Sequence, residues 1–556
     1  MRNAHIILGL VMVTQVFAQD KPEPPKREVA MPEDTVSPAA AEKLPQIDLP
    51  EYDITGTERI DLPEFSKTPI EEQRLHDQSL RGSRMEKREP GRAELGGSIK
   101  NPAGFGGTME GFSGKIIAGY SSYVTPFLDG WLGRSFRRSD FLAKAGYRST
   151  DGHVANADSR NGYASFSGGT YLPEDFGFLS GSSARAALAY QGDQYRLYGS
   201  SMPTQLRTID RWLVDLSLNS KLDDVFAFTS ALRVRSTVLF DVNRNAESSL
   251  GLEFSATRAF DMFELKGDLA AWRSIYGASS ARFDPYFTHL GLSVRYDIID
   301  RVSLVGGLAA YVVRGSDTRS IGRVYPRLGV SWYAKGWLTL FAKFEPYIQR
   351  NTLSEYLDQS PYLANDVRIR PIEHPINFSL GTEMDLASSV KTKFTFNYRQ
   401  SRNYPLYVDT AMARVWTVEY MGRTRVLSFE GEMYSDLTPA DHLGASLLLR
   451  SSRNSETGTT VPYLPSALLS GLYQHRFPFG LTLGTSLKLV GRQYADLNRS
   501  RPLRSFLLMG FTAEYVIIPR LTGVFTLNNI LNQNQVWWEN YPAQPRVVSL
   551  ALGYTW

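Results

Sequence analysis

The residue types that most often carry out chemistry are scarce in this sequence. No cysteine is present, which excludes a disulfide framework, a thiolate nucleophile and a Cys-ligated metal. No two histidines stand at metal-ligand spacing, and no H-E-x-x-H motif is present. His374 follows Glu373 and is the one histidine that suggests a catalytic group, although a solvated loop residue is the simpler interpretation. The seven histidines are His5, His76, His153, His289, His374, His442 and His475. The sequence therefore predicts that the protein is not an enzyme and holds no cofactor or metal.

The charge balance argues against a nucleic-acid partner. The formal net charge is +4 over 556 residues, whereas nucleic-acid binding needs a clustered basic face. Charges that alternate with apolar residues along the predicted strands have mixed signs, which suits a hydrated lumen without strong ion selectivity. For each residue taken singly, solvation and cross-strand pairing are the favoured explanation. These charged residues are Asp215, Glu253, Arg295, Asp297, Lys343, Glu345, Glu383, Asp385, Lys393 and Arg399.

Apolar and polar residues alternate along many short segments from about residue 93 to the end. Segments 212–219, 290–297, 378–386, 393–399 and 481–489 all show this period of two. In the final segment one face holds Val548, Leu550, Leu552, Tyr554 and Trp556. Alternation predicts β-strands with one apolar face, but it is also typical of a soluble β-sandwich.

Strand length and turn length favour a membrane barrel over a sandwich. The segments are about 9–12 residues long, as tilted membrane strands need to be. Turns alternate between short, such as 298–301, and long, such as 347–374 and 492–504, which is typical of outer-membrane barrels. A closed barrel also leaves no unpaired strand edge in lipid. We therefore expect an all-β fold, a transmembrane antiparallel β-barrel, over residues 93–556.

The N-terminal region carries export signals. Arg2 followed by the apolar run 6–13 and the site Val16-Phe17-Ala18 predicts a signal peptide, residues 1–18, that is cleaved after Ala18. Residues 19–92 are rich in Pro, Glu and Lys, which predicts a disordered periplasmic arm or a vestigial plug rather than a folded domain.

Several motifs in the second half resemble the barrels of TonB-dependent receptors. Leu353, Glu355 and Tyr356 are similar to that family's "RxPxxxELY", and "NDVRIRPIE" at 365–373 is similar to its "NPxLKPE". The stretch 527–556, "LNNILNQNQVWWENYPAQPRVVSLALGYTW", resembles the family's closing strands. The resemblance covers residues 290–556. Residues 93–290 are similar only in their pattern of short alternating strands separated by turn residues. It implies an outer-membrane location and about 22 strands, within a range of about 16 to 24.

The family's plug domain has no full counterpart in this chain. Thr55, Gly56 and Thr57 in "DITGTERIDLPEF" look like the "VVTGTR" at the start of that plug, and the remaining plug strands are missing. The resemblance implies TonB or another periplasmic protein as a partner, besides outer-membrane lipid. It also implies that the barrel-assembly machinery recognises the last strand through Tyr554 and Trp556. A lumen this wide is normally plugged, so we expect residues 44–92 or inward-folded loops to occlude it.

These features predict transport or capture of an unidentified solute at the outer membrane. The alternative is an anchor or accessory protein whose N-terminal arm recruits periplasmic partners, and an outer-membrane enzyme is the third possibility. A ligand is expected, if anywhere, at the long 347–374 loop, through Tyr356, Asp358, Tyr362 and Asp366. Trp537, Trp538 and Tyr541 are expected to belong to an interfacial aromatic girdle rather than to a ligand site.

Overall fold

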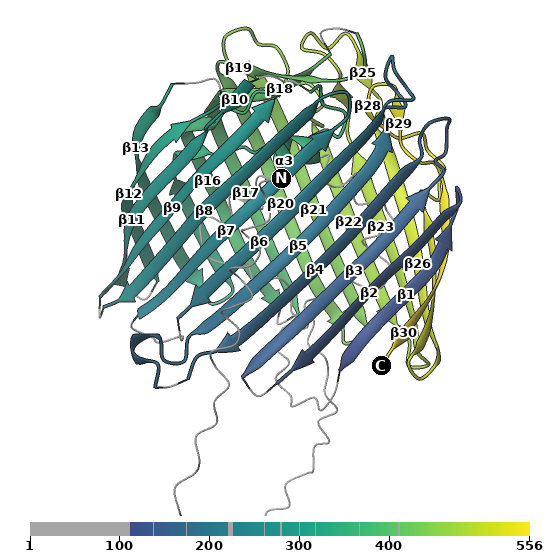
Figure 1. Ribbon diagram of the computed structural model, residues 1–556. Coiled ribbons are helices and arrows are strands. Elements are labelled where there is room, and N and C mark those ends of the chain that lie inside the picture. Colours follow the sequence, from purple (N-terminus) through teal and green to yellow (C-terminus); the bar gives the residue numbers. More distant parts are fainter. Residues whose placement is uncertain are drawn as a thin grey trace, which may run out of the picture. The chain divides into compact units, whose positions relative to one another are not determined.

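The computed structural model describes residues 112–556, apart from positions 137, 174, 221–225, 261, 279–280, 300, 317–318, 366, 388 and 410–411. These residues form one closed antiparallel β-barrel (Figure 1), so the predicted fold class is confirmed. The predicted signal peptide, the arm and the barrel start at residue 93 lie outside the described residues and stay predictions. The barrel strands are β1 (Ser113–Ser121), β2 (Thr125–Ser135), β3 (Ser139–Thr150), β4 (Ser159–Tyr171), β5 (Ser183–Arg196), β6 (Leu206–Asn219), β7 (Phe226–Phe240), β8 (Arg244–Ala259), β9 (Phe263–Ala278), β10 (Ala281–Phe283), β11 (Tyr286–Ile299), β12 (Val302–Arg314), β13 (Ile321–Lys335), β14 (Leu338–Phe344), β15 (Tyr347–Gln349), β16 (Ile372–Ala387), β17 (Val390–Arg402), β20 (Thr424–Thr438), β21 (Asp441–Asn454), β22 (Ala467–Arg476), β23 (Leu481–Val490), β26 (Phe506–Ile518), β27 (Leu521–Asn528) and β30 (Val547–Thr555).

The 24 strand segments of this sheet make 22 barrel strands. Segments β10 and β11 both pair with β9, and β14 and β15 both pair with β16, so each couple is one interrupted strand. The interruptions fall at Pro285 and Pro346, and proline has no N–H to donate to the hydrogen-bond ladder. The strand number expected from the sequence is confirmed.

The first and last strands close the barrel. Their register runs from Lys115↔Thr555 to Ser121↔Ser549. At the end of the seam, Gly114 and Trp556 exchange two backbone hydrogen bonds, each with an N···O distance of 3.1 Å. A Cβ on Gly114 would lie 2.4 Å from the Trp556 ring, so this position has room only for glycine unless the ring moves. The seam satisfies the backbone groups that an open edge would expose to lipid.

The alternation seen in the sequence separates a lipid face from a lumen face. In β30, Leu550 is 63% exposed while Ser549 is 3% exposed. Leu290, Leu292 and Leu308 are likewise exposed on the outer wall. Large exposed apolar side chains of this kind mark the band that contacts lipid. Among the described residues, no helix is long and apolar enough to span a membrane.

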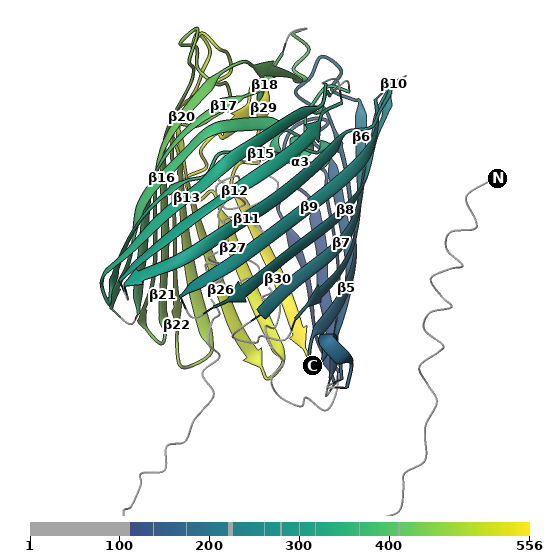
Figure 2. The same cartoon turned by 90° about the vertical axis from the view of Figure 1, so that its left-hand side faces the viewer.

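The two ends of the barrel differ in their connections (Figure 2). At the end that holds Trp556, most turns are short: 300–301, 336–337, 388–389, 439–440 and 519–520. The longer turn 172–182, with the 3-10 helix η1 (Gly177–Leu179), is the exception there. The opposite end carries the long loops 350–371, 403–423, 455–466, 491–505 and 529–546. This asymmetry assigns the long loops to the extracellular side.

A side chain added at the seam should destabilise the barrel. A Cβ on Gly119 would lie 2.3 Å from Phe127 Cζ and 2.6 Å from the Leu550 carbonyl oxygen, so Gly119→Ala is expected to cost about 1–3 kcal/mol. Chemical unfolding of the refolded barrel in detergent measures this cost. Gly306→Ala is the matched control, because nothing lies within 4 Å of its added Cβ. Equal stability of the two variants would contradict a tightly packed seam.

Candidate functional site

The largest buried apolar cluster of the described residues lies at the extracellular mouth, where it joins the loops to the barrel wall. Loop residues supply most of it, and β6, β7, β9, β23 and β26 supply the rest. We call this cluster the loop core. Its members are Ile209, Leu239, Tyr276, Leu353, Tyr356, Leu357, Leu363, Val367, Ile369, Tyr407, Trp416, Val418, Val490, Phe506, Trp537, Trp538 and Tyr541.

Helix α3 (Leu353–Gln359) opens the 350–371 loop. Thr352 and Glu355 form a capping box, in which each side chain accepts a hydrogen bond from the other residue's backbone N–H. This cap lets a helix of only two turns begin inside the barrel mouth. Its buried face consists of Leu353, Tyr356 and Leu357.

The barrel wall holds this helix from one side. Leu353 N–H donates to the Glu247 carboxylate of β8 over 2.6 Å. Arg211 of β6 donates to Ser354 Oγ at 3.2 Å and to Asp358 Oδ1 at 3.3 Å. Because strands of a closed sheet are rigid, these contacts fix α3 against β6 and β8.

A buried ion pair holds the returning part of the same loop. The Arg207 and Asp241 side chains are 1% and 0% exposed, and their nearest N···O distance is 2.7 Å. Arg207 also donates to the Pro361 carbonyl oxygen at 2.9 Å. Asn365 donates to Asp241, so both partners of the ion pair also bind the loop. The pair is fully desolvated and hydrogen-bonded, the condition under which removing one partner is costly.

Aromatic rings from other loops continue the loop core across the mouth. Tyr362 stacks on Tyr541 with ring centroids 3.6 Å apart. Trp416 Nε1–H donates to Tyr463 Oη at 3.0 Å, and Tyr463 stacks on Trp538 at 4.3 Å. The backbone adds a parallel bridge between Leu363 and Trp416.

Three of the long loops contain short hairpins, one of which carries Trp538 and Tyr541. The 403–423 loop contains β18 (Tyr404–Val408) and β19 (Thr417–Met421), and the 491–505 loop contains β24 (Gln493–Tyr494) and β25 (Pro502–Leu503). The 529–546 loop contains β28 (Val536–Trp538) and β29 (Tyr541–Pro542). Glu539 connects all three loops, since it accepts from Arg414 at 2.8 Å and from Arg501 at 2.7 Å.

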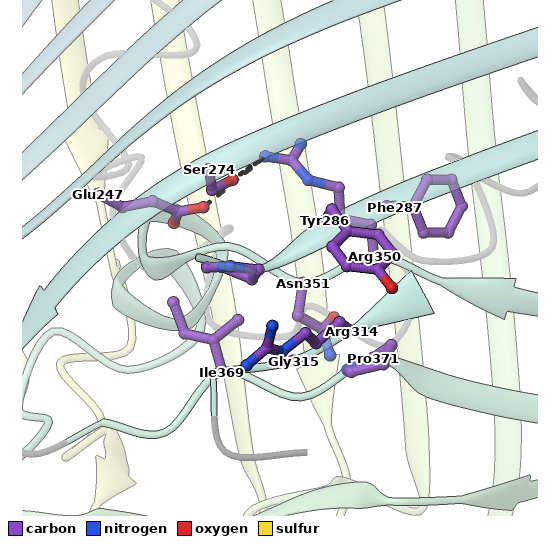
Figure 3. Close-up of a pocket in the computed structure, with 11 residues that line it drawn as sticks. Glu247, Ser274, Tyr286, Phe287, Arg314, Gly315, Arg350, Asn351, Ile369 and Pro371 are labelled. Carbon is purple, nitrogen blue, oxygen red and sulfur yellow. Dashed lines mark hydrogen bonds and ion pairs between the residues drawn. The ribbon is translucent and has the colours of Figure 1, made fainter. Parts of the chain in front are cut away.

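The loops leave two pockets beside the loop core. One, of about 310 Å³, lies between the 350–371 loop and the tops of β8, β9, β11 and β12. Figure 3 shows Glu247, Ser274 and Arg350 on one side of it, where Arg350 lies 3.4 Å from Ser274 Oγ and 3.7 Å from Glu247 Oε1. The other, of about 550 Å³, is lined by Tyr, Trp, Pro and Gln side chains and by no charged one. Both volumes include space open to solvent, so the enclosed part of each pocket has room for only a few water-sized groups, beside charged side chains in the first and ring faces in the second.

Burial keeps the tyrosines of these loops uncharged. It raises the pKa of Tyr356 well above the ordinary value, and it also raises the pKa values of Tyr463 and Tyr541. Desolvation is the main cause in each case, because a phenolate would lose its hydration. The loop core is thus an apolar and hydrogen-bonded cluster, with its charges confined to ion pairs at its edge.

The structure brings together three of the residues predicted for the ligand loop. Tyr356 and Tyr362 pack in or against the loop core, and Asp358 pairs with Arg211. Asp366, like Thr55, Gly56 and Thr57, lies outside the described residues. Ligand contact by these residues stays a prediction. Tyr554 and Trp556 lie on the outer wall, 48% and 37% exposed, where their role as an assembly signal also stays a prediction.

Two predictions about individual side chains were wrong. Trp537, Trp538 and Tyr541 do not belong to an interfacial girdle, because they are at most 5% exposed within the loop core. His374 is not a solvated loop residue, because it is fully buried against Ser401 and Tyr347. The loop that carries the three aromatic residues folds inward, whereas His374 lies in strand β16, opposite Tyr347 of β15. Alternation along strands reveals neither placement. Sequence reasoning also missed Trp416, for which the aromatic richness of the loops was the only signal, and the Arg207–Asp241 pair, for which the sequence carried no signal.

The contacts of His374 and His289 do not form an open catalytic site. His374 Nδ1 lies 2.8 Å from Ser401 Oγ, but both residues are 0% exposed, so no substrate reaches the hydroxyl. His289 lies between Asp268 and Arg327, and its Nε2 is 2.8 Å from the Arg327 guanidinium. In the part of the chain that the structure describes, no group of three His, Asp or Glu side chains is placed to hold a metal ion.

The barrel is similar to solved outer-membrane receptors. The sequence matches no known family model and no curated protein. The FrpB iron transporter of Neisseria meningitidis (F3-3 variant) matches with a TM-score of 0.63 and 12% identity, over 81% of this chain and 82% of that one. The ferripyoverdine receptor of Pseudomonas aeruginosa matches with 0.63 and 14%, over 80% and 72%. The siderophore receptor PirA of Acinetobacter baumannii matches with 0.61 and 10%, over 80% of each chain.

These neighbours are TonB-dependent receptors, so the resemblance seen in the sequence is confirmed at the level of the fold. The chain forms a β-barrel of that architecture. Identities of 10–14% show the fold alone and carry no ligand with them.

Breaking the buried ion pair should loosen the 350–371 loop. Arg207→Ala or Asp241→Ala leaves one uncompensated buried charge, which is expected to cost about 3–5 kcal/mol. The free energy of unfolding and the protease sensitivity of the loop measure the effect. Arg423→Ala is the control, because its pair with Glu456 is more than half exposed and is expected to contribute about 1 kcal/mol or less. Similar losses in both variants would contradict the proposed anchoring of the loop.

Proposed function

We propose that the protein transports or captures a solute at the outer membrane and that its own extracellular loops close the barrel mouth. A 22-stranded lumen is wide enough to breach the permeability barrier if it stays open. The loop core supplies a closure that needs no residue outside 112–556. In this proposal it is the gate, and its loops move when solute enters.

The observation that carries the proposal is the continuity of the loop core from one side of the wall to the other. On one side it contacts Ile209 of β6 and Leu239 of β7. On the other it contacts Val490 of β23 and Phe506 of β26, which meets Trp537 edge-to-face with ring centroids 5.1 Å apart. Packing of this kind leaves little room for solute in the closed state.

The names of the structural neighbours suggest the first solutes to test. They are an iron transporter, a ferripyoverdine receptor and a siderophore receptor. We propose an iron chelate as the first class for this chain. Tyr356, Asp358 and Tyr362 would hold the closed state and become available to a ligand only after the 350–371 loop moves. Thr55, Gly56 and Thr57 would link the barrel to TonB, after export through the 1–18 signal peptide.

The second candidate is an outer-membrane anchor whose arm, residues 19–92, recruits periplasmic partners. The buried Arg207–Asp241 pair favours it, since a fully desolvated ion pair suits a permanent closure. Conductance distinguishes the two functions, because only a gate needs to open.

Shortening the 350–371 loop should open the channel. Gln349 and Ile372 are register partners, so a short Gly-Ser turn can replace residues 352–368 without stretching β15 or β16. Planar-bilayer recording of the refolded chain is expected to show a closed wild type and stable conducting steps in this variant. Trp416→Ala is a milder version, expected to give brief openings, and Trp332→Ala on the outer wall is its control.

The matched control shortens the other end of the barrel. Tyr171 and Ser183 are register partners, so residues 173–181 can be replaced in the same way, and this variant should stay closed. A chain lacking residues 19–92 should also stay closed, because the loop core remains. An open wild type would contradict loop closure. A loop-shortened barrel that folds but does not conduct would also contradict closure by the loops. Wild-type openings in the presence of an iron chelate would favour the gate, and their absence would favour the anchor.

A further inference from the structure

Two arginines stand directly opposite each other on the outer wall, at its extracellular end. Arg425 of β20 and Arg453 of β21 are register partners, and both side chains are exposed. Their strand neighbours Thr424, Val426 and Ser452 are buried and face the other side of the wall. Opposed residues of an antiparallel pair hold their Cβ atoms about 4.5–5.5 Å apart, so two positive charges share one small patch.

Nothing in the described part of the chain neutralises this patch. No carboxylate there lies within 4.0 Å of either guanidinium, whereas the nearby Arg423 is paired with Glu456 at 3.8 Å. Like charges placed directly opposite each other on a sheet destabilise it. The patch therefore costs stability unless an anion from outside the chain binds between the two side chains.

The patch lies at the upper edge of the lipid-facing band. Two residues further into the barrel, Leu427 is 40% exposed. Two residues beyond that, Phe429 and Leu449 are register partners and are 38% and 44% exposed. Apolar side chains thus begin directly below the two charges, which places the guanidinium groups at headgroup depth in the outer leaflet.

We infer that Arg425 and Arg453 bind the phosphate of a phosphorylated glycolipid in the outer leaflet. Guanidinium groups donate charge-assisted hydrogen bonds to phosphate oxygens, and one phosphate between the two arginines replaces repulsion by attraction. The acyl chains lie along Leu427, Phe429 and Leu449. Free inorganic phosphate would neutralise the two charges but would not contact this apolar surface.

This lipid site does not depend on the proposed transport function. It lies next to two loops of the extracellular mouth. Thr424 directly follows the 403–423 loop, and Asn454 directly precedes the 455–466 loop. Glycolipid bound at Arg425 and Arg453 therefore holds together the two strand ends that support these loops.

The test uses the full chain, refolded in detergent, with phosphorylated lipid A as the probe. We expect lipid A to raise the thermal unfolding midpoint of the wild type. In the double variant Arg425→Gln/Arg453→Gln we expect lipid A to bind roughly tenfold to thirtyfold more weakly, as the loss of two interfacial arginines implies. Without lipid, the double variant should be as stable as the wild type or more stable, because the repulsion is gone. Weaker lipid A binding together with unchanged or higher stability would show that the variant has lost a lipid site and kept its fold.

The charge-matched control is Arg258→Gln/Arg476→Gln, which removes two exposed arginines at the opposite end. It should keep wild-type affinity for lipid A. Dephosphorylated lipid A should bind the wild type as weakly as lipid A binds the double variant. Full lipid A affinity in the Arg425/Arg453 variant would overturn the inference, and so would equal losses in both double variants. An equal response of the wild type to phosphatidylglycerol would overturn it in favour of any acidic lipid.

Discussion

The structure depends on one constraint, which is that every backbone N–H and C=O at membrane depth must find a partner within the protein. The β1–β30 pairing meets this constraint where the chain's first and last described strands close the sheet. The same constraint explains where the strand breaks at Pro285 and Pro346 lie. Both lie near the extracellular mouth, and neighbouring hydrogen bonds, such as Ser274 N–H to the Pro285 carbonyl oxygen at 2.9 Å, continue the ladder around one of them. Closure with 22 strands then fixes the width of the lumen, and that width creates the next problem.

A wide lumen needs something to fill its mouth, and the long loops supply a second hydrophobic core there. The loop core resembles the core of a soluble protein, with stacked aromatic rings, a capped helix and a desolvated ion pair. It forms because the loops start from strands that are far apart around the barrel but end over the same space. Tyr362 and Tyr541 belong to different loops, yet their rings lie 3.6 Å apart. The rigid wall thus holds these loops close to one another, as short connections hold the elements of a small globular domain.

The repeated features of the fold, its strands and turns, could be predicted from the sequence. The loop core, which occurs once, could not. Period-two alternation identified the strands and their outer faces, as in Leu550 against Ser549, because every barrel strand meets lipid on one side and the lumen on the other. Turn lengths gave the orientation for a similar reason. The loop core was not predictable, because loop residues have no periodic relation to the surface that they cover. Trp537 and Trp538 therefore suggested a membrane interface, which is the commonest place for such rings in a barrel, although they are buried in the mouth. The separation of 34 positions between Arg207 and Asp241 likewise gave no sign that the two side chains would meet.

The composition of the loop core limits how a gate at this mouth could work. A ligand shifts a closed–open equilibrium only by binding one state better than the other. The tyrosine hydroxyls of the loop core already have partners, such as Tyr356 with Tyr420 at 2.9 Å and Tyr541 with the Arg414 carbonyl oxygen at 2.9 Å. The two pockets beside the loop core are the places where a solute would bind while the core stays packed. Binding there can favour opening only by competing for residues that also hold the loops, such as Arg350 in the polar pocket and Tyr463 in the aromatic one. Solute binding that leaves those contacts intact would stabilise the closed mouth, and work applied from the periplasmic side would then be required to open it.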